Sequence, residues 1–151
     1  MVVTTGSEAQ TLALGRRLGR LLKGHDVVCL DGDLGSGKTT LTKGLARGAG
    51  SRNRVASPTF ALARIYRSPR WLIYHLDLYR VSADGTRDIG LEEFTSDPRG
   101  ICVVEWPRAG EAYYPKDRLE VRLAHLKAGR RLRFIGRGPR SREIIRRLGK
   151  N

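Results

Sequence analysis

An eight-residue phosphate-binding pattern near the start of the chain constrains its fold more than any other feature. Residues 32–39 read Gly-Asp-Leu-Gly-Ser-Gly-Lys-Thr, which is G-x-x-x-x-G-K-[ST], and they follow the apolar run 27–30. In this pattern the glycines let backbone N–H groups approach the oxygens of a polyphosphate, and the helix that follows turns its positive end towards the anion. Lys38 is expected to reach the β and γ phosphates, and Thr39 to offer its hydroxyl to Mg²⁺. The segment therefore predicts bound nucleotide.

The size of the chain favours a single domain. Its 151 residues, of which 40% are hydrophobic, suffice for one compact core and are too few for two ordinary domains. We expect residues 1–151 to form one P-loop ATPase domain with a basic C-terminal segment from about residue 129. Cys29 and Cys102 lie in apolar runs and are expected to be core thiols, which suits a reducing cytoplasm. Neither a secretory leader nor a membrane span is expected.

The chain is strongly basic. It carries 29 Lys and Arg against 15 Asp and Glu, a formal net charge of +14, and much of the excess lies after residue 129. A polyanionic partner and a solvated basic face both account for this excess, because charge alone supplies attraction without sequence readout.

Apolar periodicity and turn residues predict an ordered series of elements. They are a helix at 7–22, a strand at 27–31, a helix at 39–49, strands at 61–66 and 71–78, a loop at 84–87, a short helix at 91–94, a strand at 101–106, a hairpin at 119–123 and 132–134, and a basic helix at 141–148. Strands and helices alternate around the phosphate loop, with hairpins added. We therefore expect an α/β fold, a three-layer P-loop NTPase-type domain with a mixed central sheet flanked by helices.

Two of the apolar strands end in an acid, Asp77 in one and Glu105 in the other. A nucleotide triphosphatase needs Mg²⁺ beside the phosphates and a group that places the attacking water, and carboxylates supply both. Either acid could be the main metal ligand. His75 lies in the same apolar strand as Asp77, where a structural role is the commoner one for a lone histidine.

Other residues near these elements leave two interpretations open. Residues 57–60, Ser-Pro-Thr-Phe, either form a loop that senses the γ phosphate or a simple proline turn. Trp106, beside Glu105, either packs in the core or forms a wall of the nucleotide pocket. The sequence shows no obvious arginine finger fixed in the site, so slow intrinsic turnover is expected.

Taken in order, five motifs resemble the TsaE family, the bacterial ATPases of tRNA threonylcarbamoyladenosine biosynthesis. These motifs cover residues 8 to about 115 and read GDLGSGKTT at 32–40, SPTF at 57–60, HLDLYR at 75–80, GLEE at 90–93 and VEWP at 104–107. The resemblance implies a small ATPase that works with the TsaD and TsaB proteins, uses ATP and Mg²⁺ as cofactors, and resets that complex between turnovers. It implies no membrane partner.

The resemblance also implies roles for individual residues. Lys38, Asp77 and Glu105 would be catalytic, and Thr39, Glu105 and Asp77 would ligate Mg²⁺. The nucleotide would contact Asp33, Leu34, Gly35, Ser36, Gly37, Lys38, Thr39 and Thr40 of the phosphate loop, Thr59 of a switch-like loop, and Trp106. Contact between tRNA and the arginine-rich C-terminal segment is an inference from charge, separate from the resemblance.

Three other functions are compatible with parts of the sequence. A P-loop kinase for a small molecule shares the phosphate loop but needs an acceptor pocket and an arginine-bearing lid. A GTPase switch ranks last, because no Asn-Lys-x-Asp motif is present. A nucleic-acid-binding module would use the basic end, with ATP as a structural ligand.

Overall fold

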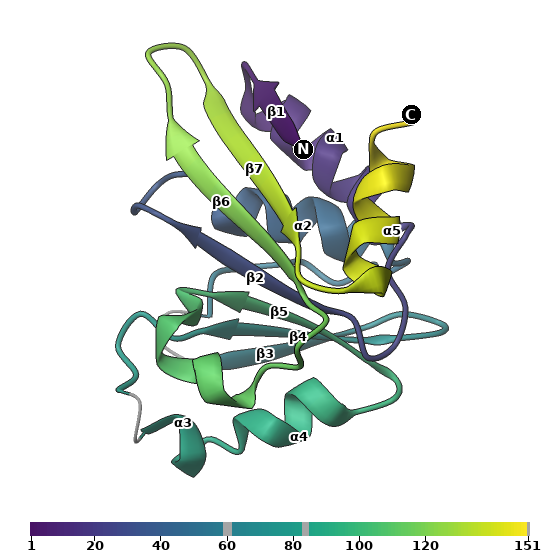
Figure 1. Cartoon of the computed structure of the whole chain (residues 1–151), viewed down its shortest axis with the longest axis vertical. Helices are drawn as coiled ribbons and strands as arrows, with labels where there is room; N and C mark the ends of the chain where they lie inside the picture. Colours follow the sequence, from purple (N-terminus) through teal and green to yellow (C-terminus); the bar gives the residue numbers. More distant parts are fainter. Residues whose placement is uncertain (59–61, 83–84, 151) are drawn as a thin grey trace.

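The chain folds around one seven-stranded sheet, with helices on both of its faces (Figure 1). The computed structural model describes residues 1–58, 62–82 and 85–150. The strands are β1 (Val2–Thr5), β2 (Val27–Gly32), β3 (Ala63–Arg67), β4 (Leu72–Asp77), β5 (Gly100–Glu105), β6 (Leu119–His125) and β7 (Arg130–Gly136). The helices are α1 (Glu8–Gly19), α2 (Lys38–Gly48), α3 (Gly85–Asp88), α4 (Leu91–Ser96), the 3₁₀ helix η1 (Pro107–Tyr113) and α5 (Pro139–Leu148).

The sheet is mixed, as the sequence predicts. Its strand order is β1-β7-β6-β2-β5-β4-β3. The neighbours β6, β2, β5 and β4 pair in parallel, whereas β1, β7 and β3 join the sheet through antiparallel pairs. The loop after β2 and the acids that end β4 and β5 therefore meet at one edge, at the carboxyl ends of the parallel strands.

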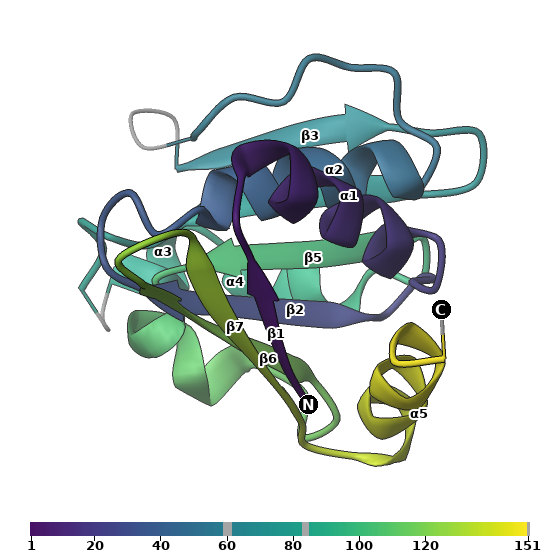
Figure 2. The same ribbon diagram turned by 90° about the horizontal axis from the view of Figure 1, so that it is seen from above.

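Alternate side chains of the central strands point into two hydrophobic cores, one on each face of the sheet. On one face, Val28 and Leu30 of β2 pack in a cluster with Leu41 and Leu45 of α2, and this cluster also includes residues of α1 and α5. On the other face, Cys29 packs in a second cluster with residues of β5 and α4. Figure 2 shows α1 and α2 together on the first side of the sheet. The alternation follows from the period of two in a strand, and it confirms the three-layer α/β fold.

The helices α1 and α2 approach each other closely through glycines. A Cβ atom placed on Gly44 of α2 would overlap with the carbonyl oxygen of Leu12 and lie 2.9 Å from the Cα of Gly15. Because no larger side chain fits between the two backbones, these glycines allow α1 to pack directly against α2.

Most predicted elements are present, and two expectations are wrong. The sequence reading missed β1, which has four residues and pairs with β7 at the far end of the chain. The stretch expected as a loop at 84–87 includes the short helix α3, whose first residue donates its N–H to the Ser82 hydroxyl over 3.1 Å. Within the described part of the chain, no helix has the length and apolar composition needed to cross a membrane.

Candidate functional site

The phosphate-binding loop connects β2 to α2, as the motif predicts. Gly35 and Gly37 adopt positive φ angles of 74° and 103°, which residues with a Cβ atom rarely adopt. The N–H of Ser36 donates to the carbonyl of Asp33 over 3.1 Å and closes a turn inside the loop. The loop therefore curls in front of the N-terminus of α2. The first N–H groups of this helix have no acceptor within the helix, so they favour an anion there.

Lys38 is folded back onto the loop that precedes it. Its ammonium donates to the carbonyl oxygens of Gly32 and Asp33 over 2.6 and 2.9 Å, and it lies 3.9 Å from the centre of the Trp106 ring. Burial lowers the pKa of Lys38 from its usual value of 10.5, and the negative charges of Glu105 and Asp77 offset part of this shift. The cation is thus held by carbonyl dipoles and a ring face, which a phosphate group can replace.

Thr39, Glu105 and His75 form a hydrogen-bonded series across α2, β5 and β4. The Thr39 hydroxyl donates to Glu105 Oε1 over 3.0 Å, and His75 Nε2 lies 2.8 Å from the same oxygen. Because an ionised carboxylate only accepts, we assign the imidazole proton to Nε2. His75 is fully buried and Glu105 nearly so. The histidine therefore fixes the orientation of the carboxylate that the sequence predicts as a metal ligand.

Asp77 lies beside Glu105 in the sheet. The two residues are direct partners in the parallel pair of β4 and β5, and both are buried. Asp77 Oδ1 accepts the N–H of Tyr79 over 3.0 Å. The prediction that two apolar strands end in these acids is confirmed, and the structure adds that the two strands are neighbours.

Tyr66 connects this series to the segment that carries the SPTF motif. Its hydroxyl donates to the carbonyl of Ala56 over 2.9 Å, accepts the N–H of the same residue over 3.2 Å, and lies 3.5 Å from His75 Nδ1. Thr59, which the resemblance assigns to a switch-like loop, lies outside the described residues. The described start of the motif is thus tied, through Tyr66 and His75, to Glu105.

Trp106 lies against Lys38 and belongs to the wall of the cavity. Its backbone has a φ of 57°, unusual for a residue with a Cβ atom, and its ring centre lies 4.8 Å from that of Tyr79. Its N–H donates to the carbonyl of Leu30 over 3.1 Å, which ties the residue after β5 to β2. Of the two interpretations left open by the sequence, the structure favours the pocket wall.

A cavity of about 180 Å³ gathers most of the predicted site residues. It is lined by Leu34, Gly35, Gly37, Lys38, Thr39, Thr40, Ser57, Asp77, Glu105, Trp106 and Arg130. Of the predicted nucleotide contacts that the structure describes, two are not part of this lining: Asp33 lies in an adjoining hollow, and the Ser36 side chain is fully buried. Their contact with a nucleotide would be through the backbone.

Arg130 is a site residue that sequence reasoning missed. It is the first residue of β7, and a Cβ atom placed on Gly37 would lie 2.8 Å from its Cδ and Nε atoms. Its Nε is buried without a hydrogen-bond partner among the described residues. From the neighbouring strand, the His125 Nε2 lies 3.2 Å from the carbonyl oxygen of Leu34. The sequence did not indicate that an arginine lines this cavity.

The residues present fit a polyphosphate and Mg²⁺. The glycine-lined loop, the Lys38 ammonium and the unpaired Nε of Arg130 are donors for phosphate oxygens. Thr39, Glu105 and Asp77 offer oxygen ligands, which Mg²⁺ prefers. Among the described residues no group of three or more His, Cys, Asp or Glu side chains is placed to hold a metal ion by itself. An open set of this kind suits Mg²⁺, which usually combines one or two carboxylates with water and substrate phosphates.

Comparison with known proteins places this arrangement in a family. A family model described as "Threonylcarbamoyl adenosine biosynthesis protein TsaE" matches residues 5–132. The chain is 39% identical over 117 residues to a tRNA threonylcarbamoyladenosine biosynthesis protein TsaE of Bacillus subtilis, covering 78% of this chain and 73% of the relative. It is 44% identical over 116 residues to a protein of the same name in Streptomyces coelicolor, covering 73% and 76% of the two chains.

A solved structure shares the fold over nearly the whole chain. The crystal structure of Bacillus subtilis YdiB superposes with a TM-score of 0.84 and 31% sequence identity, and the match covers 99% of this chain and 94% of that chain. The chain therefore belongs to the TsaE family of threonylcarbamoyl adenosine biosynthesis proteins.

Proposed function

We propose that this protein is the Mg²⁺-dependent ATPase subunit of the complex that makes threonylcarbamoyladenosine in tRNA. The observation that carries the proposal is the hydrogen bond of 3.0 Å between Thr39, directly after the phosphate-binding Lys38, and the buried Glu105. In P-loop NTPases a threonine and a strand-end carboxylate hold Mg²⁺ beside the β and γ phosphates. Membership in the family connects the site to tRNA modification.

The loop and the two cations that line the cavity, Lys38 and Arg130, would bind the phosphates. Lys38 leaves the carbonyls of Gly32 and Asp33 for the phosphate oxygens, and Arg130 approaches from β7 with its unpaired Nε. Both cations then oppose the negative charge that builds up on the transferred phosphoryl group.

Glu105 and Thr39 hold the metal edge of the site, and Asp77 lies next to them. Bound Mg²⁺ would neutralise the phosphate oxygens and help the leaving group to depart. His75 keeps Glu105 Oε1 in place through its 2.8 Å hydrogen bond, which leaves the carboxylate little rotational freedom. Besides its place at the metal edge, Asp77 would accept a hydrogen bond from the attacking water molecule and orient it towards the phosphate.

We infer that hydrolysis is slow in the isolated chain and supports turnover of TsaD and TsaB. In this proposal Arg130 takes a phosphate-contacting role, and the partners complete the remaining geometry. The reaction belongs in the cytoplasm, which fits the tRNA-modifying relatives and the two free buried thiols, Cys29 and Cys102.

The test measures threonylcarbamoyladenosine in tRNA by mass spectrometry of nucleoside digests from cells depleted of this protein. Rescue by the wild type, and failure of rescue by Lys38→Ala at equal protein level, is the expected result. Unchanged modification after depletion would contradict the proposed pathway and would direct attention to phosphoryl transfer onto a small-molecule acceptor, the alternative P-loop chemistry. Rescue by Lys38→Ala would contradict the need for nucleotide.

A further inference from the structure

The positive charge of the chain is not evenly neutralised over its surface. Three arginines of the basic C-terminal segment make close ion pairs, which are Arg137 with Glu120, Arg140 with Asp26, and Arg146 with Glu143. Each of these pairs has a shortest N···O distance of 2.7 Å. Since these guanidinium groups already have carboxylate partners, they contribute little to the attraction of an outside anion.

A second set of arginines lies on the face of β6 and β7 away from α1 and α2. Along β7, Leu132 and Phe134 point into the core, so Arg131 and Arg133 point to the other face. Arg122 lies on the same face of β6, and all three arginines are exposed. Among the described residues none of the three side chains makes a hydrogen bond or an ion pair. We call these three residues the arginine face.

The strand register places two of these cations in direct opposition. Arg122 and Arg133 are partners in the antiparallel pair of β6 and β7, and Val2 of β1 is the partner of Arg133 on the other side. Like charges at such positions destabilise a sheet. A hollow of about 570 Å³ on this face is lined by all three arginines and by small or apolar residues such as Val2 and Ala124, and no described acidic residue lines it.

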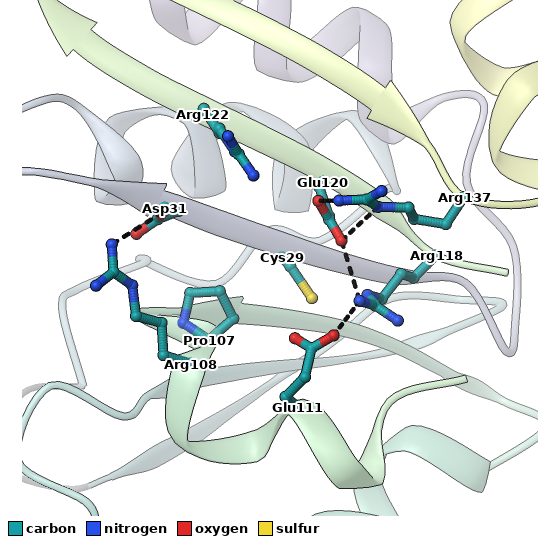
Figure 3. A pocket seen from close by; sticks show the side chains of 9 residues that line it. All are labelled: Cys29, Asp31, Pro107, Arg108, Glu111, Arg118, Glu120, Arg122 and Arg137. Carbon is teal, nitrogen blue, oxygen red and sulfur yellow. Dashed lines mark hydrogen bonds and ion pairs between the residues drawn. The ribbon is translucent and has the colours of Figure 1, made fainter. Parts of the chain in front are cut away.

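The neighbouring pocket under η1 gives a useful contrast. Figure 3 shows its arginines joined to acids, with Arg118 between Glu111 and Glu120 and Arg108 close to Asp31. Arg122 lies at the border of this pocket with no such link (Figure 3). Arg122 is also the strand partner of Asp31 in the pair of β6 and β2, and it lines a hollow with Asp31 and Asp33. The positive charge that no neighbouring acid offsets therefore lies mainly on Arg131 and Arg133, and Arg122 forms the border of the arginine face.

We propose that the arginine face binds the phosphate backbone of the tRNA on which the family acts. Arginine suits this contact because its planar guanidinium group donates two parallel hydrogen bonds to phosphate oxygens. Side chains two residues apart on one strand, with a third on the adjacent strand, form a flat cationic surface that follows a backbone without reading bases. The net charge of +14 adds long-range attraction. The proposal rests on the family's connection to tRNA and is independent of ATP hydrolysis.

Anisotropy of a fluorescent, unmodified tRNA transcript tests this surface in the absence of nucleotide. The face variant is Arg122→Gln/Arg131→Gln/Arg133→Gln, and the matched control is Arg142→Gln/Arg147→Gln/Lys150→Gln on and after α5. Both variants lose three positive charges from exposed side chains, three arginines in the face variant and two arginines and one lysine in the control, so the main difference is where the charge was removed. Binding of Mg²⁺-ADP and the melting temperature verify that each variant is folded.

The face variant is expected to bind tRNA on the order of tenfold or more weakly at low salt than the wild type. The slope of log K against log[salt] is expected to become shallower by about 2 to 3, because each lost phosphate contact removes about 0.7 to 0.9. The α5 control should keep most of the wild-type affinity for tRNA and most of its salt dependence. Equal binding by the face variant and the wild type, or an equal loss in the control, would overturn the proposal. Loss of binding to TsaD and TsaB with tRNA binding intact would also overturn it, by assigning the face to an acidic protein surface.

Discussion

The Thr39 hydroxyl donates to Glu105 Oε1 over 3.0 Å, which joins the first turn of α2 to the end of β5. These residues lie far apart in the sequence, and the parallel pairing of β2 with β5 brings them together. If both ligate one Mg²⁺, their present contact means that the metal edge of the site is formed before the metal binds. Preorganisation of this kind reduces the cost of assembling the site around nucleotide.

Replacement of His75 by Asn should slow hydrolysis with little change in nucleotide affinity. Asn is too short to hold Glu105 Oε1 from the position of the imidazole, and loss of a residue that orients a metal ligand typically costs about 10- to 100-fold. Phosphate release gives the rate, and calorimetry gives the dissociation constant for Mg²⁺-ADP.

Because His75 is fully buried, a loss of fold must be separated from a loss of orientation. Tyr66→Phe serves as the companion variant, since it removes the hydroxyl near His75 Nδ1 and keeps the aromatic ring. It should lower the melting temperature, because Ala56 loses its two hydrogen bonds with the hydroxyl, and still reduce the rate less than His75→Asn. An unchanged rate in a folded His75→Asn protein would contradict the orienting role.

The affinity for nucleotide should weaken at alkaline pH through Lys38. Burial lowers the pKa of this lysine below 10.5, whereas a bound polyphosphate stabilises its charged form and raises the pKa again. Between these two pKa values binding takes up a proton, so affinity falls by up to about tenfold per pH unit as pH rises. Below the pKa of the free protein the Lys38 contribution is constant.

Calorimetry of ADP binding from about pH 8 to about pH 10 measures this dependence. Lys38→Arg is the control, because a guanidinium group stays protonated throughout the range. A wild-type profile as flat as that of Lys38→Arg would contradict the assignment.

Trp106 should report nucleotide binding by its fluorescence. The ammonium of Lys38 lies 3.9 Å from the ring centre, and it has to move away to contact a phosphate. The chain has two tryptophans, so Trp71→Phe leaves Trp106 as the single emitter. Titration of this variant with Mg²⁺-ADP should give a saturable change in emission, and Trp71→Phe/Lys38→Ala should give a much smaller one. Calorimetric saturation without any emission change would contradict the contact.

Replacement of Gly44 by Ala should destabilise the protein despite the higher helix propensity of alanine. The added methyl group would overlap with the Leu12 carbonyl across the α1 and α2 contact, and overpacking typically costs about 1 to 3 kcal/mol. The free energy of unfolding in urea measures the effect. Gly6→Ala is the control, since a methyl group there meets a single atom, 3.5 Å away, and should change stability by less than about 0.5 kcal/mol. Equal stability of the two variants would mean that the helices can separate at little cost.

Local pattern predicted the phosphate loop, Lys38, Thr39 and the two strand-end acids, because each depends on a few consecutive residues. Local pattern did not predict that Asp77 and Glu105 are direct strand partners, because two strand-end acids in a sequence do not show that their strands are neighbours. Arg130 could not be placed from local pattern either. Its position close to Gly37 depends on the register of β7 against β6 and β1. The pair of β1 and β7 brings together strands from near the two ends of the chain.

His75 shows a different limit of sequence reasoning. The prediction of a buried histidine in an apolar strand is confirmed, since its side chain is fully buried. Its contact with Glu105 arises because β4 and β5 are parallel neighbours, and single-residue patterns carry no information on such neighbours. The same holds for the arginine face, since opposition of Arg122 and Arg133 is a property of strand register and not of charge count.

The most direct test of the ATPase account is phosphate release from ATP by wild type and Glu105→Gln, with TsaD and TsaB present. The glutamine keeps the size of the side chain and a hydrogen-bond acceptor for Thr39, but it removes the negative charge that would hold Mg²⁺. The account predicts Mg²⁺-dependent release by the wild type, and a rate at least about 100-fold lower in Glu105→Gln with Mg²⁺-free ADP binding retained. Equal rates of release by the two proteins would contradict it.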